Sequence, residues 1–155
     1  MEIHLARVQQ SRASGKNVAL ALTPGGTGDV SRSHVAWTVT KKGLPYIASP
    51  LVYRGQLYTL DKDGRLSAFA VQTGKLVYVA ARVGLTGAYA SPVAANGHIY
   101  LCGRDGSVIV VRAGKVPERV SSAQVADRIA ATPAIVGNSI YIRTHKTLYA
   151  FADGK

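Results

Sequence analysis

The sequence is poor in the residues that build covalent, metal-bound or membrane-spanning structures. Its 155 residues include a single cysteine, Cys102, which excludes a disulfide within the chain and a multi-cysteine zinc site. The longest apolar run, Leu76 to Ala81, has about six residues, whereas a helix that crosses a bilayer needs ~20. Charged residues make up 17% and hydrophobic residues 47%, a balance that excludes an intrinsically disordered chain.

Acidic residues are scarce as well, so the chain is strongly basic. Its 19 Lys and Arg against 8 Asp and Glu give a formal charge of +11. Such a charge attracts acidic partners. The basic residues are spread thinly, however, without an Arg-rich arm or a basic helix. We interpret the charge as a diffuse solubility surface. Electrostatic binding of nucleic acid or other polyanions is kept as a second alternative function, and nucleic acid is the less favoured partner.

The first residues lack the features of a targeting signal. A secretory signal peptide needs an apolar stretch near its start, and residues 1–16 contain none. We expect residues 1–16 to form a poorly structured N-terminal segment. With no signal peptide visible, either the protein is cytoplasmic as the sequence stands, or Met1 is the start of a piece whose true N-terminus lies upstream, so the sequence leaves the compartment open.

Internal repetition is the strongest signal in the sequence. Segments 48–58, 90–100 and 131–141 each read as Ala-Ser/Thr-Pro, an apolar stretch, a turn, and an apolar residue followed by tyrosine. Their prolines recur with spacings of 42 and 41 residues. Periods of roughly 40–45 residues are typical of the blades of a β-propeller.

Each repeat predicts four short antiparallel strands. In the first repeat, glycine-containing turns at 54–55, 61–64 and 73–74 separate runs of alternating or apolar residues. We therefore expect an all-β fold, a partial β-propeller of about three four-stranded antiparallel blades. The repeats are expected at about 46–80, 88–118 and 129–155 within a repeat domain at 17–155, and an outer strand at 35–40 precedes them.

Residues 68–78 carry a family resemblance. They read Ala-Phe-Ala-Val-Gln-Thr-Gly-Lys-Leu-Val-Tyr. This stretch resembles the tryptophan-docking repeat of PQQ-like propellers, with Ala70 in place of an Asp and Tyr78 in place of the Trp. Trp37 stands at a docking position of the preceding blade. The resemblance covers about residues 26–152 and implies the propeller fold, with relatives that are often periplasmic or exported.

The resemblance also implies what the chain binds. Members with the quinone cofactor bind it with calcium and typically place an adjacent cysteine pair beneath it. Cys102 stands alone in this sequence, so we expect no quinone and no other cofactor. The non-catalytic relatives, which include an outer-membrane assembly lipoprotein, use the propeller as a platform for proteins. The expected function is therefore a binding or interaction module, and an enzyme is less favoured.

Three blades form an open arc, because propellers close with typically four to eight. Apolar blade faces exposed at the ends of an arc favour association. We expect a protein partner or self-association there, including a two-fold dimer that closes a six-bladed ring. The alternative is that the chain is a fragment of a longer propeller.

An enzymatic alternative is a calcium-dependent hydrolase that acts on small lactones or esters. Some propellers hold one calcium ion that polarises a carbonyl group and activates water. The turn at 61–64 offers Asp61 and Asp63 as oxygen ligands for calcium. Under this hypothesis, His98 and Asp105 are the candidate catalytic residues.

Overall fold

The chain folds into four antiparallel β-sheets. The computed structural model describes residues 4–10, 17–40 and 43–152, and the structural statements below refer to these residues. The first sheet has three strands: β1 (His4–Gln10), β2 (Asn17–Leu22) and β3 (Val35–Val39). The second has four: β4 (Leu51–Tyr53), β5 (Gln56–Leu60), β6 (Arg65–Ala70) and β7 (Leu76–Arg82). The third has four: β8 (Val93–Ala95), β9 (His98–Cys102), β10 (Ser107–Arg112) and β11 (Arg119–Gln124). The fourth has three: β12 (Ala134–Val136), β13 (Ser139–Arg143) and β14 (Leu148–Ala152).

Tight turns set the register of the two complete sheets. Between β4 and β5, Arg54 and Gly55 both have positive φ, at 48° and 74°. Between β8 and β9, Asn96 and Gly97 repeat this with 49° and 81°. Two positive φ values in a two-residue hairpin match the right-handed twist of the flanking strands. These hairpins confirm the turns expected from the sequence.

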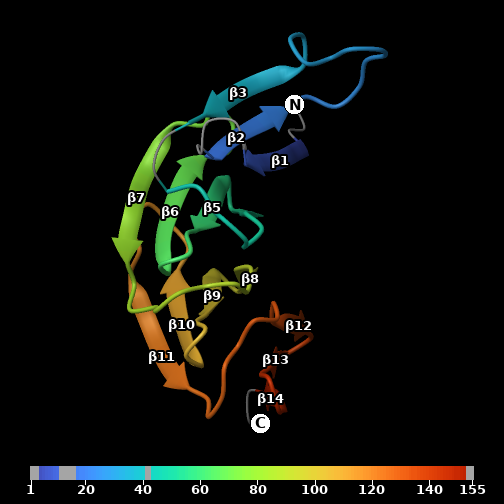
Figure 1. Ribbon diagram of the computed structural model, residues 1–155. Helices are drawn as coiled ribbons and strands as arrows, with labels where there is room; N and C mark the ends of the chain where they lie inside the picture. Colours follow the sequence, from blue (N-terminus) through green and yellow to red (C-terminus); the bar gives the residue numbers. More distant parts are fainter. Residues whose placement is uncertain (1–3, 11–16, 41–42, 153–155) are drawn as a thin grey trace.

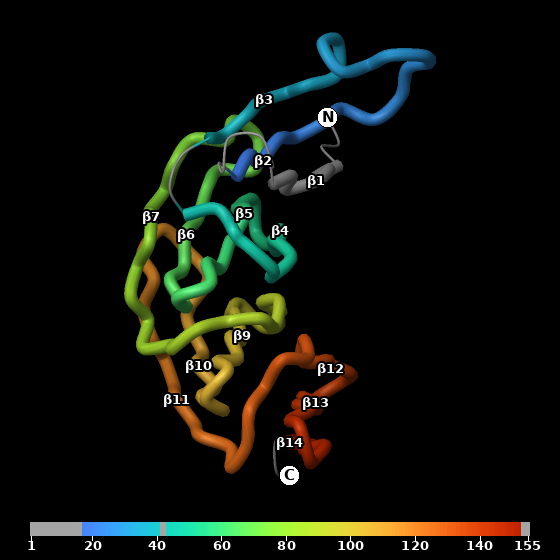
Figure 2. The backbone as a smooth tube through the Cα atoms, in the orientation of Figure 1, coloured from blue at the N-terminus to red at the C-terminus, as the bar shows by residue number. Residues whose placement is uncertain are grey.

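The four sheets follow one another along an arc (Figure 1). Strands β3, β7 and β11 lie on its outer side, and the first and fourth sheets lie at opposite ends of the arc (Figure 2). The inner strand β8 contacts both β4 and β12. In the described part of the chain, no helix is long and apolar enough to cross a membrane.

Hydroxyl groups link the inner ends of successive repeats. The Ser49 N–H donates to Ser91 Oγ at 2.8 Å, and the Ser91 N–H donates to Thr132 Oγ1 at 3.0 Å. These residues occupy the same place in the three Ala-Ser/Thr-Pro segments. The repeated hydroxyl therefore accepts a backbone hydrogen bond from the preceding repeat, where the sequence alone suggested only a small packing residue.

The apolar core lies between neighbouring sheets. Leu57 and Phe69 face the first sheet and pack with Ala19, Val39 and Leu44. A larger cluster joins the second and third sheets, and a third cluster joins the third and fourth. Since burial of apolar area is the main favourable term in folding, these interfaces hold the arc together.

Trp37 of β3 fastens the first sheet to the second. Its Nε1–H donates to the carbonyl oxygen of Val71 at 2.9 Å. Its ring lies over Gly74, where an added Cβ would come within 2.8 Å of two ring atoms. Gly74 also has a φ of 65°, which side chains other than glycine rarely adopt. The docking position expected for Trp37 is confirmed.

Tyr78 of β7 takes the corresponding place at the next interface. It packs against the core cluster shared by the second and third sheets. Its hydroxyl group is buried and, among the described residues, has no hydrogen-bond partner. Burial raises the pKa of Tyr78 far above its ordinary value. Tyr78 thus fills the docking position by apolar contact, without the hydrogen bond that Trp37 makes.

The structure confirms the all-β partial propeller and differs from the expectation in three details. Four sheets are present in the described residues, and only two of them have four strands. The segment 1–16 contains strand β1, which pairs with β2. The repeat expected at 88–118 extends to Gln124, because β11 continues the pairing with β10. The outer strand expected at 35–40 is β3, and its partner is β2.

Candidate functional site

The strand order gives the arc two distinct faces. Because the strands of each sheet alternate in direction, turns between second and third strands lie on the same side as the connections between sheets. We call this side the linker face; it includes residues 61–64, 83–92, 103–106, 125–133 and 144–147. The other side carries the remaining hairpins, including 54–55, 71–75 and 96–97, and we call it the hairpin face.

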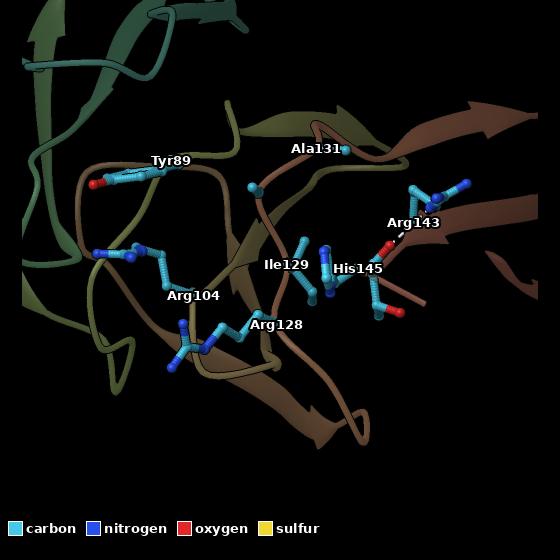
Figure 3. Close-up of a pocket in the computed structure, with 9 residues that line it drawn as sticks. Tyr89, Arg104, Arg128, Ile129, Ala131, Arg143 and His145 are labelled. Carbon is cyan, nitrogen blue, oxygen red and sulfur yellow. Dashed lines mark hydrogen bonds between the residues drawn. The ribbon is translucent and has the colours of Figure 1, made fainter. Parts of the chain in front are cut away.

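A cavity of about 400 Å³ opens on the linker face between the third and fourth sheets. Its lining combines three arginines and a histidine with a tyrosine and small or apolar residues (Figure 3). The lining residues are Tyr89, Arg104, Arg128, Ile129, Ala130, Ala131, Arg143, Thr144 and His145. We call this cavity the arginine pocket. No aspartate or glutamate of the described chain lines it.

One wall of the arginine pocket is a stacked pair. The Arg104 guanidinium carbon lies 4.2 Å from the centroid of the Tyr89 ring, and Figure 3 shows the two groups lying one over the other. The Arg104 N–H donates to the carbonyl oxygen of Gly87 at 3.1 Å, which ties the turn of the third sheet to the connection that carries Tyr89. Cation–π contact orients the guanidinium and leaves its edge free to donate hydrogen bonds.

The other wall joins the connection 125–130 to the fourth sheet. Ile129 forms an isolated β-bridge with Thr144, and its side chain is fully buried. The His145 N–H donates to the carbonyl oxygen of Arg128 at 3.0 Å. Arg143 donates from Nε to the carbonyl oxygen of Thr144 at 2.7 Å, and its guanidinium group points away from Arg104 and Arg128 (Figure 3), on the face of β13 that also carries Tyr141. The backbone therefore fixes this wall, and the Arg128 guanidinium extends to the side of Arg104.

The positive charges of the arginine pocket are not neutralised by ion pairs. The two salt bridges of the described residues join Lys62 to Asp63 and Arg112 to Glu118, both outside the pocket. Asp127 lies beside the pocket, where it accepts from the backbone N–H groups of Arg128 and Lys146. The pKa of Asp127 is lowered, first by the Arg128 bond. Its carboxylate is thus engaged with backbone donors.

The proposed calcium ligands are engaged within their own turn. Asp61 Oδ1 accepts from the backbone N–H groups of Asp63 and Arg65, both at 2.9 Å. Asp63 pairs with Lys62 at 2.6 Å, and this contact lowers the pKa of its carboxyl group. These contacts explain both residues as turn formers. No group of three or more His, Cys, Asp or Glu in the described residues is placed to hold a metal ion.

The candidate catalytic residues His98 and Asp105 do not share a site. His98 begins β9 at the hairpin face, and Asp105 lies in the turn after β9 at the linker face. A five-residue strand separates them by roughly 15 Å or more. Asp105 Oδ1 instead accepts from the N–H and the hydroxyl of Ser107. The structure therefore does not form the acid–base pair that the hydrolase hypothesis needs.

Cys102 does not offer a reactive thiol or a quinone support. Its side chain is fully buried in the cluster between the third and fourth sheets. Burial raises the pKa of its thiol to about 12, so it stays protonated at neutral pH. The residues present do not fit the paired-cysteine support of the quinone-binding members, and we derive no chemistry through a quinone. The absence of a cofactor stays a prediction.

The arginine pocket was not predicted from the sequence. The stacking of Arg104 on Tyr89 carries no sequence signal, because it depends on how a connection packs against a turn. Arg143 does differ from its counterparts in the two preceding repeats, because Leu60 and Cys102 are fully buried against the next sheet. That difference marks the outward face of the fourth sheet and does not point to the pocket.

The radial sheets, the docking tryptophan and the repeated hydroxyl links define the class: an all-β protein built from PQQ-like propeller repeats. The family described as outer membrane protein assembly factor BamB matches residues 10–154. The chain belongs to this family. No curated protein sequence matches the chain.

Solved structures show the same fold. BamB from Moraxella catarrhalis is 18% identical with a TM-score of 0.67, over 88% of this chain and 42% of that chain. The quinohemoprotein alcohol dehydrogenase ADHIIG from Pseudomonas putida HK5 is 19% identical with a TM-score of 0.57, over 72% and 19%. A europium-containing methanol dehydrogenase is 15% identical with a TM-score of 0.52, over 79% and 27%. The chain thus spans less than half the length of these proteins.

Proposed function

We propose that the chain is a protein-binding module that takes part in outer-membrane protein assembly and engages its partner through the linker face. The single observation that carries this proposal is the arginine pocket, a cavity of about 400 Å³ whose charged groups form no ion pair among the described residues. The process comes from the description of the matched family. A concave, largely apolar site with a few convergent polar groups is the usual form of a binding site.

Contact surfaces for proteins have a recognisable composition. Tyrosine and arginine are enriched where binding energy concentrates, and both line this pocket. Two hydrogen-bonded connections and a β-bridge hold its walls, so little ordering is needed when a partner binds. These features favour a preformed binding surface over a catalytic centre, since no acid–base pair was found there.

Site-specific photo-crosslinking in the host cell tests the proposal. A photoreactive residue replaces Ala131, which is exposed and lines the pocket. The matched control replaces Gln72, which is exposed in a turn of the hairpin face. We expect the Ala131 variant alone to form a covalent adduct with a defined protein of outer-membrane assembly. Equal adducts at both positions, or none at either, would contradict the proposal.

We also propose that a second copy of the chain covers the outward face of the fourth sheet. Tyr141 is 37% exposed there, whereas Tyr58, at the corresponding position of the second sheet, is fully buried against the third. Val136 and Leu148 are 65% and 63% exposed beside it. The sequence predicted three blades for each copy, and hence a six-bladed ring for a dimer. The described residues form four sheets, so two copies would supply eight. The 42% coverage of the Moraxella catarrhalis BamB chain supports two such arcs in a complete ring.

Analytical ultracentrifugation tests this second proposal. We expect a concentration-dependent dimer that Leu148→Asp shifts to monomer, because a buried unpaired carboxylate disfavours the contact. Val52→Asp is the control, since Val52 is also an exposed apolar residue but belongs to the second sheet. A monomer at every concentration would refute self-association. No observation favours calcium-dependent hydrolysis or polyanion binding, and both stay predictions from the sequence.

A further inference from the structure

We propose that the arginine pocket recognises an acidic peptide segment, with carboxylate side chains of the partner paired to Arg104 and Arg128. This inference rests on the proposed function and names the chemistry of its partner. Three arginines and His145 surround one cavity, and no carboxylate of the described chain lines it. An anionic group is therefore the complement that the pocket lacks.

The guanidinium groups of the pocket are placed to donate hydrogen bonds to a ligand. Arg104 is held by its stack on Tyr89, and Figure 3 shows the Arg128 guanidinium extending to the same side of the pocket, whereas the Arg143 guanidinium points away from both. None of the hydrogen bonds described above uses the guanidinium N–H groups of Arg104 or Arg128. A planar guanidinium binds a carboxylate through two parallel hydrogen bonds, a geometry that lysine cannot supply. Two oriented guanidinium groups in one pocket fit two carboxylates of a single segment.

The distribution of charged residues on the linker face favours a peptide over a polyphosphate chain as the ligand. Binding a nucleic acid backbone needs a continuous basic track that neutralises several phosphates. On the linker face the basic residues alternate with carboxylates instead: Asp63 pairs with Lys62, and Asp105 and Asp127 follow within the next turns. The positive field is thus confined to the pocket. Its apolar floor, including Ile129 and Ala131, suits apolar side chains between the acidic ones.

Fluorescence polarisation with two labelled peptides tests the inference. One peptide alternates Glu with Leu, and the matched peptide alternates Gln with Leu. We expect the full chain to bind the Glu peptide at least about tenfold more tightly, and added salt to weaken this binding. Equal affinity for the two peptides would overturn the inference.

Substitutions of single arginines test whether the Glu peptide binds in the arginine pocket. We expect Arg104→Gln and Arg128→Gln each to weaken binding of the Glu peptide about tenfold, in the range of interface arginines. Arg128→Gln is the safer variant, because the backbone of Arg128 makes its hydrogen bonds to the fold, whereas the Arg104 side chain supports a wall. Arg32→Gln is the control, since Arg32 is exposed in the loop between β2 and β3. An equal loss in Arg32→Gln would show a diffuse charge effect and overturn the inference.

Two further outcomes separate the sources of failure. If inorganic polyphosphate displaces the Glu peptide at lower concentration than unlabelled Glu peptide does, the pocket is a phosphate site and the acidic-peptide assignment is wrong. If the peptides fail to bind while the photoreactive residue at Ala131 still captures a partner, the binding module stands and only its acidic specificity is refuted.

Discussion

The contact between Trp37 and Gly74 allows a sharp test of how the sheets are joined. At Gly74, a methyl group faces two obstacles: a φ of 65° and a Cβ position 2.8 Å from the indole ring. The left-handed backbone costs a residue with a Cβ roughly 1–2 kcal/mol. Displacing the ring also breaks its hydrogen bond to Val71, worth about 1 kcal/mol. We expect Gly74→Ala to lower the free energy of unfolding by about 2–3 kcal/mol.

The same substitution in a Trp37→Ala background isolates the contact. Trp37→Ala itself is expected to cost about 3–5 kcal/mol, the usual range for truncation of a packed Trp. Once the ring is absent, Gly74→Ala should cost only the backbone part, about 1–2 kcal/mol. Urea unfolding of the four proteins gives the coupling free energy directly.

A second glycine provides the control. Gly55 has a φ of 74° in the hairpin between β4 and β5, and an added Cβ there meets nothing within 4 Å. Gly55→Ala should cost about 1–2 kcal/mol, with or without Trp37. If Gly74→Ala costs the same in both backgrounds to within about 0.5 kcal/mol, the ring does not rest on Gly74 and the reasoning is refuted.

Three further predictions concern the inner links, the core and the turns. Ser91→Ala should lower stability by about 1 kcal/mol and speed exchange of the Ser49 amide hydrogen, because its acceptor is lost; unchanged exchange would contradict the link. Tyr78→Phe should leave stability unchanged or raise it by up to about 1 kcal/mol in urea unfolding, since it removes a buried hydroxyl without a partner; a loss above about 1 kcal/mol would reveal a missing partner. Millimolar calcium should leave the melting temperature unchanged, because Asp61 and Asp63 are engaged by backbone and lysine donors; a rise that Asp63→Ala abolishes would restore the calcium site.

The fold was largely predictable because its markers recur in each repeat. The Ala-Ser/Thr-Pro segments mark the inner strands, and the glycine turns mark the hairpins. The docking position of Trp37 was predicted through the family resemblance, whereas its contact with Gly74 is known only from the structure. Strand β1 was missed because His4–Gln10 carries none of these markers, and its place depends on pairing with β2.

The candidate site was not predictable in the same way. Arg104 and Arg128 come from a turn and a connection that meet only when the third and fourth sheets pack. Residues that are brought together by the packing of two sheets have no fixed spacing in the sequence. The candidate pair His98 and Asp105 shows the opposite case: the two residues are close in sequence, but the strand between them carries them to opposite faces. Proximity in the chain was a poor guide wherever a strand intervened.

Hydrogen–deuterium exchange on the chain with its crosslink-identified partner tests the central claim, binding through the linker face, most directly. We predict slower exchange on complex formation in segments 83–92, 103–106, 125–133 and 144–147, which surround the arginine pocket. Exchange in the hairpin turns 54–55, 71–75 and 96–97 should stay unchanged. Protection of those hairpin turns, with the pocket segments unaffected, would contradict the account.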